Sequence, residues 1–120
     1  MSRVYQRLLK INGSLDDIHY IMDSVDFKIT RAIEDKILKP AVRMHIVKIA
    51  EQFNKLKEEN EFKTLEVFDS NDLRGLNAVR NFIAHDYDSV DDSIIEDVVR
   101  INLPEIQKVI KFLMVDTKDV

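Results

Sequence analysis

The chain has 120 residues, of which 45% are hydrophobic and 33% charged, with only two Gly and two Pro. This length suits one domain with a single core, and the composition argues against a disordered, collagen-like or turn-rich β protein. The formal net charge of −4 argues against a general nucleic-acid coat, and the lack of Cys excludes disulfides, thiol catalysis and Cys-based zinc sites. Without a secretory-signal pattern or an apolar run of membrane-spanning length, we expect a single all-α domain over residues 1–120, cytoplasmic and without a membrane segment.

The first half of the chain predicts three helices. Over residues 4–25, apolar side chains recur at alternating spacings of four and three, which is typical of a helix with one buried stripe. Thr30 could cap a short helix over residues 31–36, and Pro40 suits the first turn of the next helix. The apolar stripe of that helix ends at Leu56, and a polar loop follows over residues 57–66.

The third long helix is predicted to begin near Ser70. Asp69 or Ser70 can accept its free N–H groups, and Asp72 suits the positive end of its dipole. Its inward positions are Leu73, Leu76, Val79 and Ile83.

A last helix is predicted to run as far as Leu113, with Pro104 as a kink. Its cap is one of Asp91, Asp92 and Ser93. The fold class is therefore all-α, an antiparallel bundle of four to five helices whose sequential members pack side by side because their connections are short.

The segment NAVRNFIAHDYDSV, residues 77–90, places Arg80, Asn81, His85 and Tyr87 within eight positions. At about 100° per residue, Asn81 and His85 share one helix face, whereas Arg80 and His85 lie about 140° apart. A two-fold dimer could assemble these groups around one cleft, because it presents the same helix end from both chains. We therefore expect a homodimer.

The residue types in this segment suit RNA chemistry. A His can donate and accept protons near neutral pH, and an Arg can hold a phosphate, so Arg80 and His85 suffice in principle for metal-free attack of a 2′-hydroxyl on the adjacent phosphorus. Asn81 could bind the phosphate or orient His85, and Tyr87 could stack on a base or donate to an oxygen. From residue types alone, the more common explanation is that the same groups cap helix carbonyls and pair with the acidic run Asp86, Asp88, Asp91 and Asp92.

The segment RNFIAHDY matches the HEPN superfamily motif of Arg, four residues, His, any residue and Tyr. AVRMHIVKIAEQFNKL resembles the second long helix of the HepT-like branch, and LRGLNAVRNFIAHDYDSVDDSIIEDVVRINLPEI resembles its motif helix, acidic turn and final helix. The resemblance implies a HEPN-like homodimeric ribonuclease toxin, partnered by a minimal nucleotidyltransferase antitoxin. Arg80 and His85 would then cleave RNA with Asn81 in support, and Tyr87 would be the AMPylation site that silences the enzyme.

Two departures from the family accompany this resemblance. The loop over residues 58–67 lacks the usual Pro and Trp, and the chain is net acidic. A second hypothesis is therefore a non-catalytic helical dimer that binds a nucleotidyltransferase or its nucleotide in the same cleft.

Some other residues have competing interpretations. His19, His45 and His85 lie on different predicted helices without a ligand pattern, so we predict no metal site and no cofactor. Glu51 could form a salt bridge with Arg80 or Arg74, or be an exposed or capping carboxylate.

Two groups of charged residues also have competing interpretations. The acidic run is a solvated turn with a helix cap, a contact for a basic partner, or a means of tuning His85. The basic positions Lys36, Lys39, Arg43 and Lys48 either line an RNA path or form an ordinary charged helix face.

Overall fold

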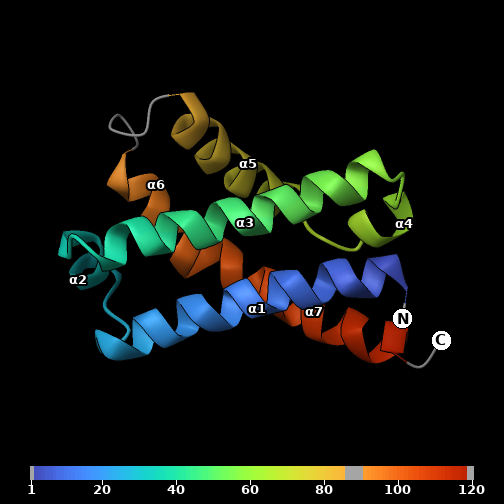
Figure 1. Ribbon diagram of the computed structural model, residues 1–120, viewed down its shortest axis with the longest axis horizontal. Coiled ribbons are helices and arrows are strands. Elements are labelled where there is room, and N and C mark those ends of the chain that lie inside the picture. Colours follow the sequence, from blue (N-terminus) through green and yellow to red (C-terminus); the bar gives the residue numbers. More distant parts are fainter. Residues whose placement is uncertain (1, 86–90, 119–120) are drawn as a thin grey trace.

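The computed structural model describes residues 2–85 and 91–118, and within these ranges every regular element is helical (Figure 1). The all-α prediction is therefore confirmed. The elements are α1 (Arg3–Ser24), α2 (Ile29–Glu34), α3 (Leu38–Glu58), α4 (Phe62–Leu65), α5 (Ser70–His85), α6 (Asp92–Asp97), the π-helix η2 (Val98–Asn102) and α7 (Leu103–Lys118).

The long helices pack in an antiparallel arrangement that follows their apolar stripes. Helix α3 runs antiparallel beside α1, α5 runs antiparallel to α3, and α7 returns along α1 (Figure 1). The predicted stripes of the first two long helices form the centre of the core. Buried members of these stripes are Leu8, Ile11, Leu15, Ile18, Met22, Val42, Ile46, Ile49, Phe53 and Leu56.

Helix α2 begins earlier than its sequence pattern indicates. The predicted cap Thr30 lies inside the helix, which starts at Ile29 after Lys28. The start moves because Ile29 is buried in the core, and because Asp26 and Phe27, at φ values of 56° and 59°, turn the chain back immediately before it. Tertiary burial therefore overrides the capping preference of a Thr.

Side-chain capping holds the start of α3. Asp35 Oδ1 accepts hydrogen bonds from the backbone N–H groups of Ile37 and Leu38 at 2.8 and 2.9 Å. These two bonds, the one from Leu38 first, lower the pKa of Asp35. Pro40 lies in the first turn of the helix, as predicted, where its missing N–H removes no intrahelical hydrogen bond.

The predicted loop over residues 57–66 contains one turn of helix, α4. Asn60, at φ 60°, ends α3, and the chain then returns over the core. Phe68 is buried, and its ring packs edge-on against Phe53 with centroids 4.9 Å apart. This contact fixes the point from which α5 starts.

The expected single last helix is divided by η2, which ends two residues before Pro104. At the end of η2, the N–H of Leu103 donates to the carbonyl of Val98, a π-type bond that spans five residues. Pro104 has no N–H to continue the ladder, so the predicted irregularity occurs here, in the form of a π segment.

In the part of the chain that the structure describes, no helix combines the length and apolarity needed to cross a membrane.

Candidate functional site

The end of α5 carries the candidate site, and several contacts fix that helix. At its start, Asp69 Oδ1 accepts from the backbone N–H of Asn71 at 2.7 Å, as one of the two predicted caps. Asp72 is buried and accepts from Asn102 Nδ2 of η2 at 2.8 Å. Leu76 and Val79 are buried on the core side. The opposite side of the helix therefore faces solvent.

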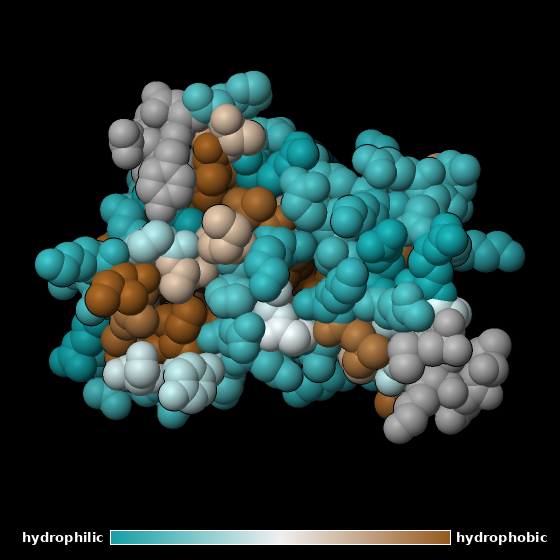
Figure 2. Space-filling model, in the orientation of Figure 1, coloured by the Kyte–Doolittle hydropathy of each residue, from teal (hydrophilic) through white to brown (hydrophobic). Residues whose placement is uncertain are grey.

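Helix α5 diverges from α3 toward its C-terminal end, so that its last turn lies at the upper left of Figure 1. The side chains of Asn81 and His85 are exposed there. Phe82, between them in sequence, is 47% exposed, although it is a large apolar residue. This end of α5 thus combines polar groups with an uncovered aromatic ring, and Figure 2 shows hydrophobic surface in the same region of the molecule.

Arg80 is held by a carboxylate from the neighbouring helix. Its Nε donates to Glu51 Oε1 of α3 at 2.6 Å, which confirms one of the two partners predicted for Glu51. Its Nη1 also lies 3.4 Å from Asn81 Oδ1. With 37% of the Arg80 side chain exposed, the guanidinium is oriented by protein contacts while part of it stays accessible to a ligand.

The structure brings together only some of the predicted site residues. Arg80 and Asn81 are in contact, and His85 is the last residue of α5. Tyr87, together with Asp86 and Asp88 of the acidic run, lies outside the described residues. Their predicted roles are not tested by the geometry.

The two described members of the acidic run have definite partners. Asp91 caps α6 by accepting from the backbone N–H of Ser93 at 2.9 Å and from its hydroxyl at 2.8 Å, and these bonds lower the pKa of Asp91. Asp92 binds Lys39 Nζ at 3.1 Å and Arg43 Nη2 at 3.0 Å. The predicted cap is therefore Asp91, and Asp92 attaches α6 to α3.

These ion pairs also give two of the four basic positions a structural role. Lys39 and Arg43 share the single carboxylate of Asp92, and the Arg43 side chain is only 4% exposed. Arg43 is too buried to line a surface path, whereas Lys39 is still 33% exposed, so an RNA path that includes Lys36, Lys39 and Lys48 stays a prediction. Their charges hold the start of α6 against α3.

The three histidines lie on three different helices, His19 on α1, His45 on α3 and His85 on α5. Within residues 2–85 and 91–118, no group of three or more His, Cys, Asp or Glu side chains could hold a metal ion. His45 faces Asp17, with 3.8 Å between Nε2 and Oδ2. Burial lowers the pKa of His45, and the carboxylate of Asp17 partly opposes this effect.

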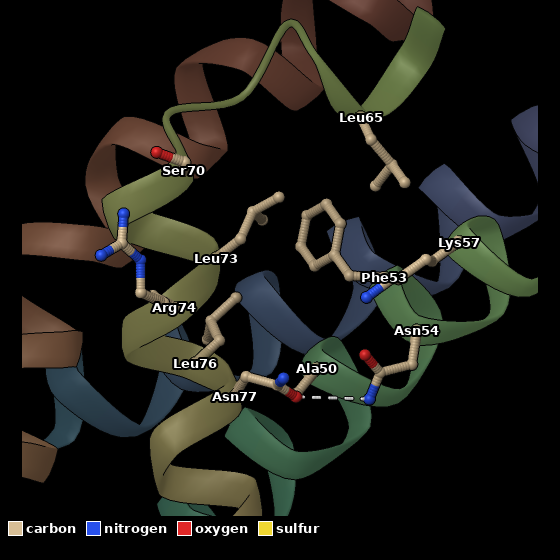
Figure 3. A pocket seen from close by; sticks show the side chains of 10 residues that line it. All are labelled: Ala50, Phe53, Asn54, Lys57, Leu65, Ser70, Leu73, Arg74, Leu76 and Asn77. Atoms are coloured by element: carbon tan, nitrogen blue, oxygen red, sulfur yellow. Dashed lines mark hydrogen bonds between the residues drawn. The ribbon is translucent and has the colours of Figure 1, made fainter. Parts of the chain in front are cut away.

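Nearer the start of α5 than the Arg80 and Glu51 pair, a cavity of about 310 Å³ lies between α3, α4 and α5 (Figure 3). Asn54 Nδ2 of α3 donates to Asn77 Oδ1 of α5 at 3.4 Å, one helical turn from that pair. Lys57 and Arg74 also line the cavity. Sequence reasoning missed this site, although the spacing of Arg74, Asn77 and Asn81 already placed a polar stripe on the motif helix.

Comparison with known proteins identifies the chain. The family model described as Ribonuclease HepT-like matches residues 11–113. No curated protein and no solved structure matches the chain. The match covers most of the 120 residues, including all of α5 and its motif. The chain therefore belongs to the HepT-like ribonuclease family.

Proposed function

We propose that this protein is a metal-independent endoribonuclease that uses Arg80 and His85. The observation that carries the proposal is an anchored, partly exposed guanidinium and an exposed imidazole on the last turns of one helix. The family match over residues 11–113 supports ribonuclease activity for this arrangement.

The proposed reaction is transfer of the phosphoryl group within the RNA chain. The 2′-oxygen loses its proton to a base and bonds to the adjacent phosphorus, while the bond to the 5′-oxygen breaks and that oxygen receives a proton. His85 would serve these proton transfers, and Arg80 would stabilise the charge on the non-bridging oxygens. Asn81 would support the phosphate or the imidazole. No covalent bond to the protein is required.

A homodimer would bring together two side chains that point to different sides of α5. Arg80 and His85 are about 140° apart around the helix, so one chain directs them to different sides. A two-fold partner would bring the His85 of one chain toward the Arg80 of the other. The exposed Phe82 beside the motif offers apolar surface for such a contact.

The proposal includes a toxin role with a minimal nucleotidyltransferase as the antitoxin. That enzyme would transfer AMP to Tyr87. A bulky, negatively charged group beside Arg80 and His85 would fill the cleft and repel the phosphates of RNA.

Incubation of the purified protein with RNA in the presence of a chelator tests the ribonuclease proposal. We expect cleavage by the unmodified protein and none by His85→Ala or Arg80→Ala. Because the two side chains are proposed to act across a dimer, a mixture of these two inactive variants should recover part of the activity. Cleavage that requires a divalent metal, or that His85→Ala retains in full, would contradict the proposal.

One observation favours the non-catalytic alternative. Arg80 is already paired with Glu51, and the chain carries a net charge of −4, which suits a protein partner better than a polyanion. Intact mass after co-expression with a nucleotidyltransferase separates the two functions. An added AMP group that disappears in Tyr87→Phe supports the regulated toxin, whereas a stable unmodified complex without nuclease activity supports the binding module.

A further inference from the structure

The cavity between α3, α4 and α5 has an apolar floor. Figure 3 shows the ring of Phe53 facing Leu73, with Leu65 of α4 closing one side and Leu76 lying below. Its volume of about 310 Å³ is at the lower end of the range for small-ligand pockets. An apolar floor beside an aromatic ring is suited to a flat, unstacked base.

The rim of the cavity is polar and carries positive charge. Lys57 extends from α3 beside the opening, and Arg74 lies on the outer side of α5 (Figure 3). The long hydrogen bond of 3.4 Å between Asn54 and Asn77 spans the rim. Because that bond is weak, the two amides are able to exchange it for hydrogen bonds to the edge of a base.

The cavity continues the exposed face of the motif helix. Arg74, Asn77, Asn81 and His85 are all exposed, and at about 100° per residue they lie within about 80° of one another around α5. Arg74 is about 16 Å from His85 along the axis, at a rise of about 1.5 Å per residue. One extended single strand of RNA lying along this face could therefore contact the motif and the cavity at the same time.

The cations at the rim differ from the paired cations Arg80, Lys39 and Arg43. Arg80 is paired with Glu51, and both Lys39 and Arg43 are paired with Asp92. For Lys57 and Arg74, by contrast, the described parts of the chain provide no ion-pair partner. Because both of these cations line one cavity and have no ion-pair partner within residues 2–85 and 91–118, they give the cavity a local positive charge that suits an anion.

We propose that this cavity is a nucleotide subsite for single-stranded RNA. A base from a nucleotide near the cleaved bond enters between Phe53 and Leu73, and Lys57 and Arg74 bind the adjoining phosphates. The inference rests on the proposed ribonuclease function and adds the substrate class, because only an unpaired strand can release a base into the cavity.

The test is binding of a short single-stranded oligoribonucleotide whose 2′-hydroxyls are methylated, which prevents cleavage by the proposed reaction. The variants are Lys57→Gln and Arg74→Gln. Lys55→Gln is the matched control, since Lys55 is an exposed residue of the same helix that does not line the cavity. We expect each rim variant to bind the oligoribonucleotide roughly 3- to 10-fold more weakly than the unsubstituted protein. The slope of log affinity against log salt concentration should become shallower by about 0.7 in each rim variant. Both quantities should be unchanged in the control.

Equal affinity in all four proteins would overturn the subsite, as would the absence of binding by the unsubstituted protein. Loss of binding to a nucleotidyltransferase in the rim variants, with RNA affinity unchanged, would make the cavity a protein contact and also overturn it. Cleavage of unmethylated RNA is measured separately, so failure of the subsite leaves the nuclease proposal standing. Binding through Lys57 and Arg74 without cleavage would instead contradict only the nuclease proposal.

Discussion

Replacement of Glu51 by Ala should damage activity far more than stability. Glu51 accepts the hydrogen bond from Arg80 Nε at 2.6 Å, but the two side chains are 40% and 37% exposed. Solvent screens such a pair, so its contribution to the free energy of unfolding is about 0.2–1 kcal/mol. For a chain of 120 residues the unfolding entropy is about 0.25 kcal/mol per kelvin, so the melting temperature should fall by about 1–4 °C.

The catalytic effect of the same substitution follows from the position of the Arg80 guanidinium. Without the carboxylate, the guanidinium of Arg80 is free to leave the place where a phosphate would bind, and a displacement of about 1 Å costs up to about 100-fold in rate. We therefore expect Glu51→Ala to lower RNA cleavage by about 10- to 100-fold. Glu51→Gln keeps an oxygen acceptor for Arg80 Nε and should lose less than about tenfold.

The assay compares initial cleavage rates with thermal unfolding of the same preparations. Glu58→Ala is the matched control, because Glu58 is an exposed carboxylate of the same helix with no ion-pair partner within residues 2–85 and 91–118. Full activity in Glu51→Ala would refute the positioning role. The positioning role would also be refuted if the fraction of unfolded protein at the assay temperature fully explained the loss of activity.

Further predictions concern stability. Gly13→Ala should raise the free energy of unfolding by about 0.5–1 kcal/mol, because a Cβ there meets nothing within 4 Å, whereas Gly75→Ala should lower it by about 1 kcal/mol, because its Cβ would lie 3.0 Å from Asn102 Oδ1. Urea unfolding checks both, and a gain in stability at Gly75 would contradict the close contact. Burial lowers the pKa of His45 below its ordinary value of 6.5, so the stability it contributes is complete above that value and is lost as the pH falls toward the lowered pKa. His45→Gln should remove this part of the pH dependence of urea unfolding, and an unchanged profile would show that another group is responsible.

The sequence by itself determined the helices and the place of the motif. Apolar stripes of helical period predicted the long helices α1 and α3, and the Asp69 cap predicted where α5 begins. Both features are local, because the period and the cap each depend on residues within a few positions of one another. The motif residues also carried the family resemblance, which the match to residues 11–113 confirms.

Local patterns were less reliable where tertiary packing sets the boundary. The short helix starts at Ile29, before the predicted cap Thr30, because burial of its apolar residues fixes the start. Pro104 indicated a break in the last helix, but its form, the π segment over Val98–Asn102, depends on how that segment packs. Asn102 belongs to this segment, and there it binds the buried Asp72 of α5.

Only the tertiary structure decided which side chains meet between helices. The sequence left Glu51 with two possible partners or none, and left Lys39 and Arg43 open as an RNA path. The structure pairs Glu51 with Arg80 and places both basic residues against the carboxylate of Asp92. Such pairs depend on the rotation of each helix about its axis and on its register against its neighbour. Both are set by close packing of the whole core, which no local pattern encodes.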